Sequence, residues 1–113
     1  MIRDAQRIDH MLDFVRRSLE ILEGVDRQTF LSSRGLQEQV ELNFLHLGEA
    51  ASRVSEGVKD AYPGIPWHEM VGMRNVLVHE YFRVNPAILF ETVTTQFQTL
   101  AHQLDELQGE YPP

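Results

Sequence analysis

The sequence predicts an all-α protein, an up-and-down bundle of four main helices with a possible short extra helix. Apolar residues recur every three or four positions over three long stretches, the period of a helix with one buried face. No stretch of useful length alternates apolar and polar residues as a half-buried strand does, and no internal repeat is present. The 113 residues are enough for a single domain, 1–113, with a modest core.

The first helix is expected over residues 3–23, where apolar residues fall at intervals of four, three, four and three: Ile8, Leu12, Val15, Leu19 and Leu22. Gly24 is well placed to end this helix in a left-handed cap. A second helix is expected over 34–56, with one apolar face: Leu36, Val40, Phe44, Leu47, Ala51 and Val54. Between the two, residues 26–33 form either a short turn of helix or a loop.

Residues 57–66 hold two prolines and two glycines and are expected to form a loop. Pro66 suits the first turn of a third helix over 67–81, in which Trp67 anchors the core. Asn85 and Pro86 are a start signal for the last helix, an Asn cap followed by a proline at the first position. The apolar row of that helix is long: Leu89, Val93, Phe97, Leu100, Leu104 and Leu107.

Several large apolar residues flank these rows, and a small bundle cannot cover all of them internally: Met11, Phe14, Ile21, Ile88 and Phe90. Burial between two copies of the chain would cover them, so the pattern predicts a homodimer. The alternative is partial exposure, which is common on protein surfaces.

Composition excludes several classes of protein. No apolar run approaches the roughly 18 residues needed to span a bilayer, and the N-terminus leads into a charged amphipathic pattern, which predicts a cytoplasmic protein without membrane contact. The absence of cysteine excludes disulfides, thiolate metal sites and a cysteine nucleophile. The five histidines form no Glu-x-x-His or His-Glu-x-x-His pattern, so neither a metal nor a cofactor is predicted. His10, His68 and His102 are expected at the surface, and His46 half-buried.

The chain carries 17 acidic and 10 basic residues, a formal net charge of −7. A protein that binds nucleic acid non-specifically is usually basic. If this protein handles RNA, it must do so at a local basic pocket, with a partner or a second subunit adding positive charge.

The segment 74–81 holds the chemistry-bearing residues Arg74, His79 and Tyr81. A guanidinium is a permanently charged fork suited to phosphate oxygens, and an imidazole exchanges protons near neutral pH. Together they suffice to break a phosphodiester by attack of its own 2′-hydroxyl without a metal. On one continuous helix, Arg74 and Tyr81 would be nearly eclipsed, and with Asn75 and His79 would fit an arc of roughly 160°.

A structural interpretation remains open for the same residues. A histidine near a helix end often bonds a carbonyl, and Arg74 could pair with Glu80 or with Glu49. The segment 47–51 places Glu49 beside Gly48 and two alanines, small residues that let another helix approach closely. Glu49 therefore either neutralises Arg74 or lies at the surface.

The string Pro-Trp-His-Glu-Met-Val-Gly-Met-Arg-Asn-Val-Leu-Val-His-Glu-Tyr at 66–81 resembles the signature of the HepT-like proteins, a branch of the HEPN superfamily. The segment 47–51, with Asn43 ahead of it, matches their second main helix. The resemblance covers nearly the whole chain. It implies a HEPN-like helical homodimer in which the polar motifs of two subunits meet in a cleft.

HepT-like proteins are metal-independent endoribonuclease toxins of toxin–antitoxin pairs. Their antitoxin is an MntA-like minimal nucleotidyltransferase that transfers AMP to the motif tyrosine. The resemblance implies that Arg74 and His79 cleave RNA, supported by Asn75 and Glu49, and that Tyr81 receives AMP, its phosphate lying beside Arg74. A different reading is a non-catalytic module that docks the nucleotidyltransferase and is modified by it.

Overall fold

The computed structural model describes residues 3–112, and all regular structure in this range is helical, which confirms the predicted all-α class. The elements are α1 (Asp4–Leu22), α2 (Arg27–Leu31), α3 (Arg34–Arg53), α4 (Glu56–Ala61), α5 (Trp67–His79), the 3-10 turn η1 (Tyr81–Arg83) and α6 (Pro86–Glu110). Within this range no helix combines the length and apolarity needed to cross a bilayer.

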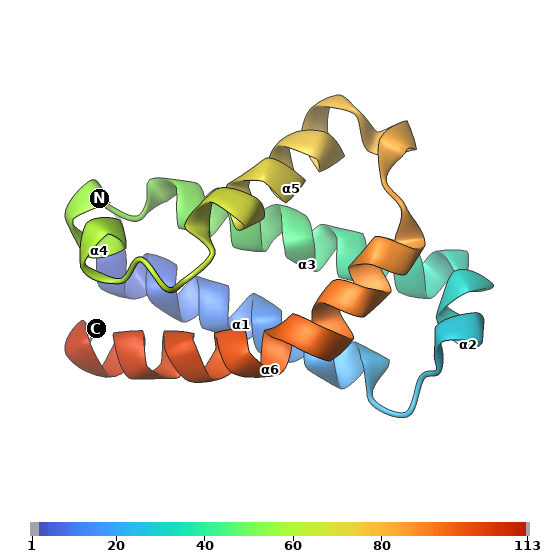
Figure 1. Cartoon of the computed structure of the whole chain (residues 1–113), viewed down its shortest axis with the longest axis horizontal. Helices are drawn as coiled ribbons and strands as arrows, with labels where there is room; N and C mark the ends of the chain where they lie inside the picture. The colour runs from blue at the N-terminus through green and yellow to red at the C-terminus, as the bar shows by residue number, and fades with distance from the viewer. Residues whose placement is uncertain (1–2, 113) are drawn as a thin grey trace.

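Helix α3 is the centre of the bundle, with α1 against one side and α5 against the other (Figure 1). Helix α6 packs mainly on α1, and its second half runs alongside it (Figure 1). Helix α5 rises obliquely from α3, which leaves a groove of about 520 Å³ between α5 and α6. The four main helices are thus present as predicted, with the bundle open on one side.

The three predicted apolar rows form the core, and only Leu19 and Leu36 among them are partly exposed. Met11 is fully buried inside one chain, so the expectation that it needs a second copy is wrong. Phe14, Ile21 and Phe90 are partly buried against the same core, whereas Ile88 is 49% exposed. These flanking residues therefore give little support to a dimer.

The ends of the first helices follow from local chemistry. Gly24 has a φ of 73°, the left-handed conformation predicted for it. Asp26 accepts a hydrogen bond from the Thr29 N–H at 2.7 Å and so caps α2, which shows that the segment 26–33 contains a helical turn. The same backbone hydrogen bond holds the pKa of the Asp26 carboxyl below its usual value.

Two predicted boundaries are wrong. The second helix ends at Arg53, before the predicted residue 56, and residues 57–61 of the predicted loop belong to α4, because Val58 is buried in the core and the Asp4 carboxylate accepts two hydrogen bonds from Ser55 just before the helix. Helix α5 ends at His79, not at Tyr81, since Glu80 leaves the helical conformation with φ −141° and ψ 45°. The 3-10 turn η1 follows directly and begins the connection from α5 to α6, which starts at Pro86.

The N-terminal cap of α6 allows a first test of how much capping contributes to the stability of the fold. Asn85 accepts a hydrogen bond from the Ala87 N–H at 3.0 Å, as the predicted cap. Asn85→Ala is expected to lower the free energy of unfolding by about 1 kcal/mol, because that N–H loses its partner. Asn85→Asp retains a capping acceptor and should remain close to wild type in urea unfolding. An equal loss in both variants would contradict a capping role.

Candidate functional site

The site begins where α3 and α5 cross, at Gly48. A Cβ atom on Gly48 would lie 2.7 Å from the carbonyl oxygen of Met70 and would also strike the side chain of Arg74. Only glycine allows the two helices to approach so closely here, as the sequence indicated. The crossing fixes the base of the Arg74 side chain directly against α3.

The Arg74 guanidinium is held by two neighbours. Its Nε donates to Oε1 of Glu49 at 2.5 Å, Nη2 lies 2.5 Å from the same oxygen, and Nη1 donates to Oδ1 of Asn75 at 2.8 Å. Glu80, the other predicted candidate, pairs with Arg83 at 2.9 Å instead. The pairing of Arg74 with Glu49 is therefore confirmed.

Arg74 retains some capacity to bind an anion. Three of the five N–H donors of a guanidinium are engaged by Glu49 and Asn75, which leaves two without a partner among residues 3–112. The Arg74 side chain as a whole is 29% exposed. Asn75 acts here as an acceptor that orients Arg74, while the carboxylate of Glu49 offsets much of its positive charge.

His79 is the last residue of α5, and its side chain is exposed. It has no side-chain hydrogen bond to any residue in 3–112. Five positions along a helix place His79 about 140° around the axis from Arg74 and about 7.5 Å further along it. Arg74 bonds to Glu49 of α3 and to Asn75, and no hydrogen bond joins it to His79.

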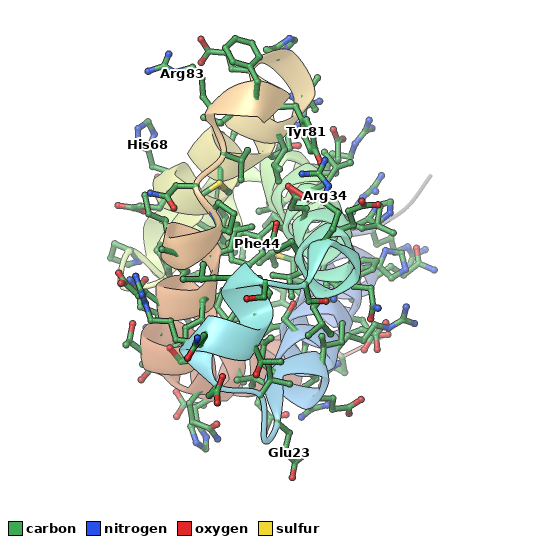
Figure 2. All side chains as sticks on the ribbon, turned by 90° about the vertical axis from the view of Figure 1, so that its right-hand side faces the viewer. Glu23, Arg34, Phe44, His68, Tyr81 and Arg83 are labelled. Carbon is green, nitrogen blue, oxygen red and sulfur yellow. The ribbon has the colours of Figure 1, made fainter. Side chains whose placement is uncertain are left out.

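Tyr81 lies beyond the end of α5, so the predicted near-eclipse with Arg74 on one helix is wrong. Its hydroxyl accepts a hydrogen bond from Nη2 of Arg34 at 2.8 Å and donates one to Oε1 of Glu41 at 3.3 Å. Figure 2 shows Tyr81 and Arg34 side by side. A group attached to Tyr81 would therefore start beside Arg34 instead of Arg74.

The surroundings of Tyr81 favour its neutral form. Partial desolvation, together with the negative charge of Glu41, raises the pKa of the phenol above its ordinary value, and the Arg34 guanidinium opposes this effect. Burial likewise raises the pKa of Glu41, against the hydrogen bond from Tyr81 and the charge of Arg34. Both pKa shifts act in the same direction, and the phenol donates its proton in a hydrogen bond to Glu41.

Sequence reasoning missed Arg34 and Glu41. They precede Tyr81 by 47 and 40 positions and lie on the polar side of α3, where nothing distinguishes them from other solvated charges. Only the tertiary fold, which places the Tyr81 hydroxyl against α3, brings them to the phenol.

The remaining predicted positions divide as follows. Trp67 is buried and its indole N–H donates to the Tyr62 carbonyl at 3.0 Å, which confirms the core anchor. Three histidines are exposed as expected: His10, His68 and His102. His46, expected half-buried, is exposed and stacks on Phe14 with ring centroids 5.0 Å apart. Within 3–112, no three His, Asp or Glu side chains gather as a metal site would require.

Comparison with known proteins identifies the family. The family model described as "Ribonuclease HepT-like" matches residues 11–107. A protein of Thermococcus cleftensis named "Probable ribonuclease HepT" is 30% identical over 101 residues, covering 86% of this chain and 92% of its own. A protein of Caldanaerobacter subterraneus subsp. tengcongensis named "Putative RNase TTE0752" is 28% identical over 100 residues, covering 88% and 89%. No solved structure matches significantly. The chain therefore belongs to the ribonuclease HepT-like family of the HEPN superfamily.

Proposed function

We propose that this protein is a metal-independent endoribonuclease that cleaves RNA with Arg74 and His79 at the cleft of a homodimer. The observation that carries the proposal is the family match over 11–107, which includes the whole motif. The geometry adds a guanidinium with two donors that no residue of 3–112 engages, and an exposed imidazole at the end of the same helix.

The chemistry assigns a role to each group. His79 takes the proton of the 2′-hydroxyl or supplies one to the leaving 5′-oxygen, a contribution of typically 10²–10⁴ in rate. Arg74 holds the scissile phosphate with its two remaining donors and stabilises the additional negative charge of the transition state. The 2′-oxygen forms a bond to phosphorus, the bond to the 5′-oxygen breaks, and a 2′,3′-cyclic phosphate remains.

Ideal helix geometry, which sets Arg74 and His79 about 140° apart around α5, supports a site completed by a second protomer. Exposed apolar side chains in and beside the motif support such an interface: Val78 precedes His79 at 47% exposure, and Phe82 follows Tyr81 at 85%. Two motifs in one cleft would also bring two guanidinium and two imidazole groups together, which concentrates positive charge in a protein of net charge −7.

The direct test uses protein produced without any nucleotidyltransferase, single-stranded RNA and EDTA. Cleavage that leaves cyclic phosphate ends is expected, together with complete resistance of the same strand made with 2′-deoxyribose, since that strand lacks the nucleophile. Cleavage of the deoxyribose strand, or a requirement for added metal, would exclude the mechanism.

Glu49 is expected to act as a positioning residue for Arg74. Glu49→Ala frees the guanidinium from α3, and displacement by about 1 Å can lower the rate by up to 10²-fold. Glu49→Gln retains an acceptor for Nε, so it should restore most of the cleavage rate seen with wild type. Equal losses in the two variants would show that the charge of Glu49, and not its position, is what matters.

We further propose that the protein is the toxin of a toxin–antitoxin pair, neutralised when an MntA-like nucleotidyltransferase transfers AMP to Tyr81. Glu41 and Glu49 lie eight positions apart on α3, so the two clusters are separated by about 12 Å along the helix and fall within about 80° around it. An adduct on Tyr81 would therefore extend over the face that carries Arg74 and obstruct RNA there. Mass measurement after co-expression should show added AMP on Tyr81 and none in Tyr81→Phe.

One observation favours a second candidate, a non-catalytic module that docks the nucleotidyltransferase and is modified by it. Glu49 partly neutralises Arg74, as a purely structural ion pair would. Under this reading Tyr81→Phe loses the modification, but the unmodified protein neither cleaves RNA nor arrests growth. The cleavage assay on unmodified protein therefore separates the two functions.

A further inference from the structure

The Tyr81 hydroxyl lies between two charged groups that are both contributed by α3. Arg34 donates to it at 2.8 Å, with its guanidinium carbon 5.7 Å from the centre of the phenol ring, and Glu41 accepts from it at 3.3 Å. The acceptor and the donor capacity of the phenol are thus both used. The side chain is nevertheless 43% exposed, so an incoming reagent has access to the oxygen.

We propose that Glu41 is the base that activates Tyr81 as a nucleophile toward the α-phosphorus of a nucleoside triphosphate, and that Arg34 stabilises the negative charge that develops. This inference rests on the proposed modification of Tyr81. It assigns part of the transfer chemistry to the acceptor protein itself, through two residues outside the 74–81 motif.

The step balances as follows. The phenolic proton passes from Oη of Tyr81 to Oε1 of Glu41 while Oη forms a bond to the α-phosphorus. The bond from that phosphorus to the oxygen bridging to the β-phosphoryl group breaks, and pyrophosphate leaves. The product is a phosphodiester between Tyr81 and the nucleoside, and its charged oxygen lies within reach of the Arg34 guanidinium.

The charges around Tyr81 are consistent with Glu41 acting as the base and Arg34 stabilising the negative charge that develops. A phenol with a raised pKa does not ionise by itself at neutral pH, so it needs a proton acceptor at the moment of attack. Burial raises the pKa of Glu41, which makes it a stronger base than an ordinary carboxylate. Arg34 favours the phenolate as it forms, and a guanidinium is also well suited to phosphoryl oxygens.

A biotinylated fluorophosphonate tests the proposal without any partner enzyme, because it forms the same bond between a nucleophile and phosphorus with loss of fluoride. Peptide mass spectrometry is expected to find Tyr81 labelled faster than Tyr62 and Tyr111, which are half-buried internal references. Glu41→Gln should slow labelling of Tyr81 at neutral pH tenfold or more, the lower range for loss of a base. Arg34→Ala should slow it as well.

The controls use the neighbouring ion pair, Glu80 with Arg83, which is not bonded to the phenol. Glu80→Gln and Arg83→Ala are expected to label at the wild-type rate. If Glu41 acted only through its charge, Glu41→Gln would lower the pKa of Tyr81 and speed labelling, so an unchanged or faster rate overturns the inference. Slower labelling in Glu41→Gln, together with no RNA cleavage by the unmodified protein, supports the inference while rejecting the nuclease.

Discussion

His79→Ala is expected to lower kcat/KM for RNA cleavage by about 10²–10⁴, the usual effect of losing a general acid or base. The structure indicates that this loss would be chemical, because the side chain is exposed and has no hydrogen bond within residues 3–112. The free energy of unfolding should therefore remain close to that of wild type. Initial rates on a labelled RNA in EDTA, with circular dichroism to check the fold, measure both quantities.

The matched control is His102→Ala, which removes an exposed histidine from α6, a helix outside the motif. It should cleave RNA at the wild-type rate. Retained cleavage in purified His79→Ala would rule out the proposed mechanism, whereas equal losses in both histidine variants would point to a general effect on solubility or assembly.

Gly48→Ala should lose more stability than Gly→Ala at any other helical glycine of residues 3–112, because it alone places the added Cβ within 3 Å of other atoms. The added Cβ would lie 2.7 Å from the Met70 carbonyl, a backbone atom that can move only if α3 and α5 separate. Overpacking costs roughly 1–3 kcal/mol, and a rigid neighbour places this site near the upper end. We expect a fall in Tm of about 10 °C by thermal unfolding, given the usual scaling for a chain of this size.

Cleavage should fall as well in Gly48→Ala, since the Cβ would also displace the base of Arg74. Gly35→Ala is the control on the same helix: nothing lies within 4 Å of its added Cβ. That variant should unfold at or slightly above the wild-type temperature, because alanine is the better helix former. A Gly48→Ala protein as stable as Gly35→Ala would show that the two helices can separate freely.

The sequence was sufficient for the helical class and the core. Apolar spacing identified the faces of α1, α3 and α6, and local chemistry located the left-handed Gly24 and the Asn85 cap. These features depend on residues within a few positions of each other, which is why periodicity and capping preferences recover them. The early end of α5 and the short helix α4 escaped prediction, because the first depends on the non-helical conformation of Glu80 and the 3-10 turn after it, and the second on burial of Val58 in the tertiary core.

By itself, the sequence determined which groups the motif contains: a guanidinium, an imidazole and a phenol within eight positions. Only the tertiary structure decided their neighbours. It paired Arg74 with Glu49 across the crossing at Gly48, and it placed Tyr81 between Arg34 and Glu41. The physical reason is that helix packing brings together residues that lie tens of positions apart in the sequence. In addition, the non-helical conformation of the single residue Glu80 ends α5 before Tyr81, so the phenol does not lie on the helix where spacing alone had placed it.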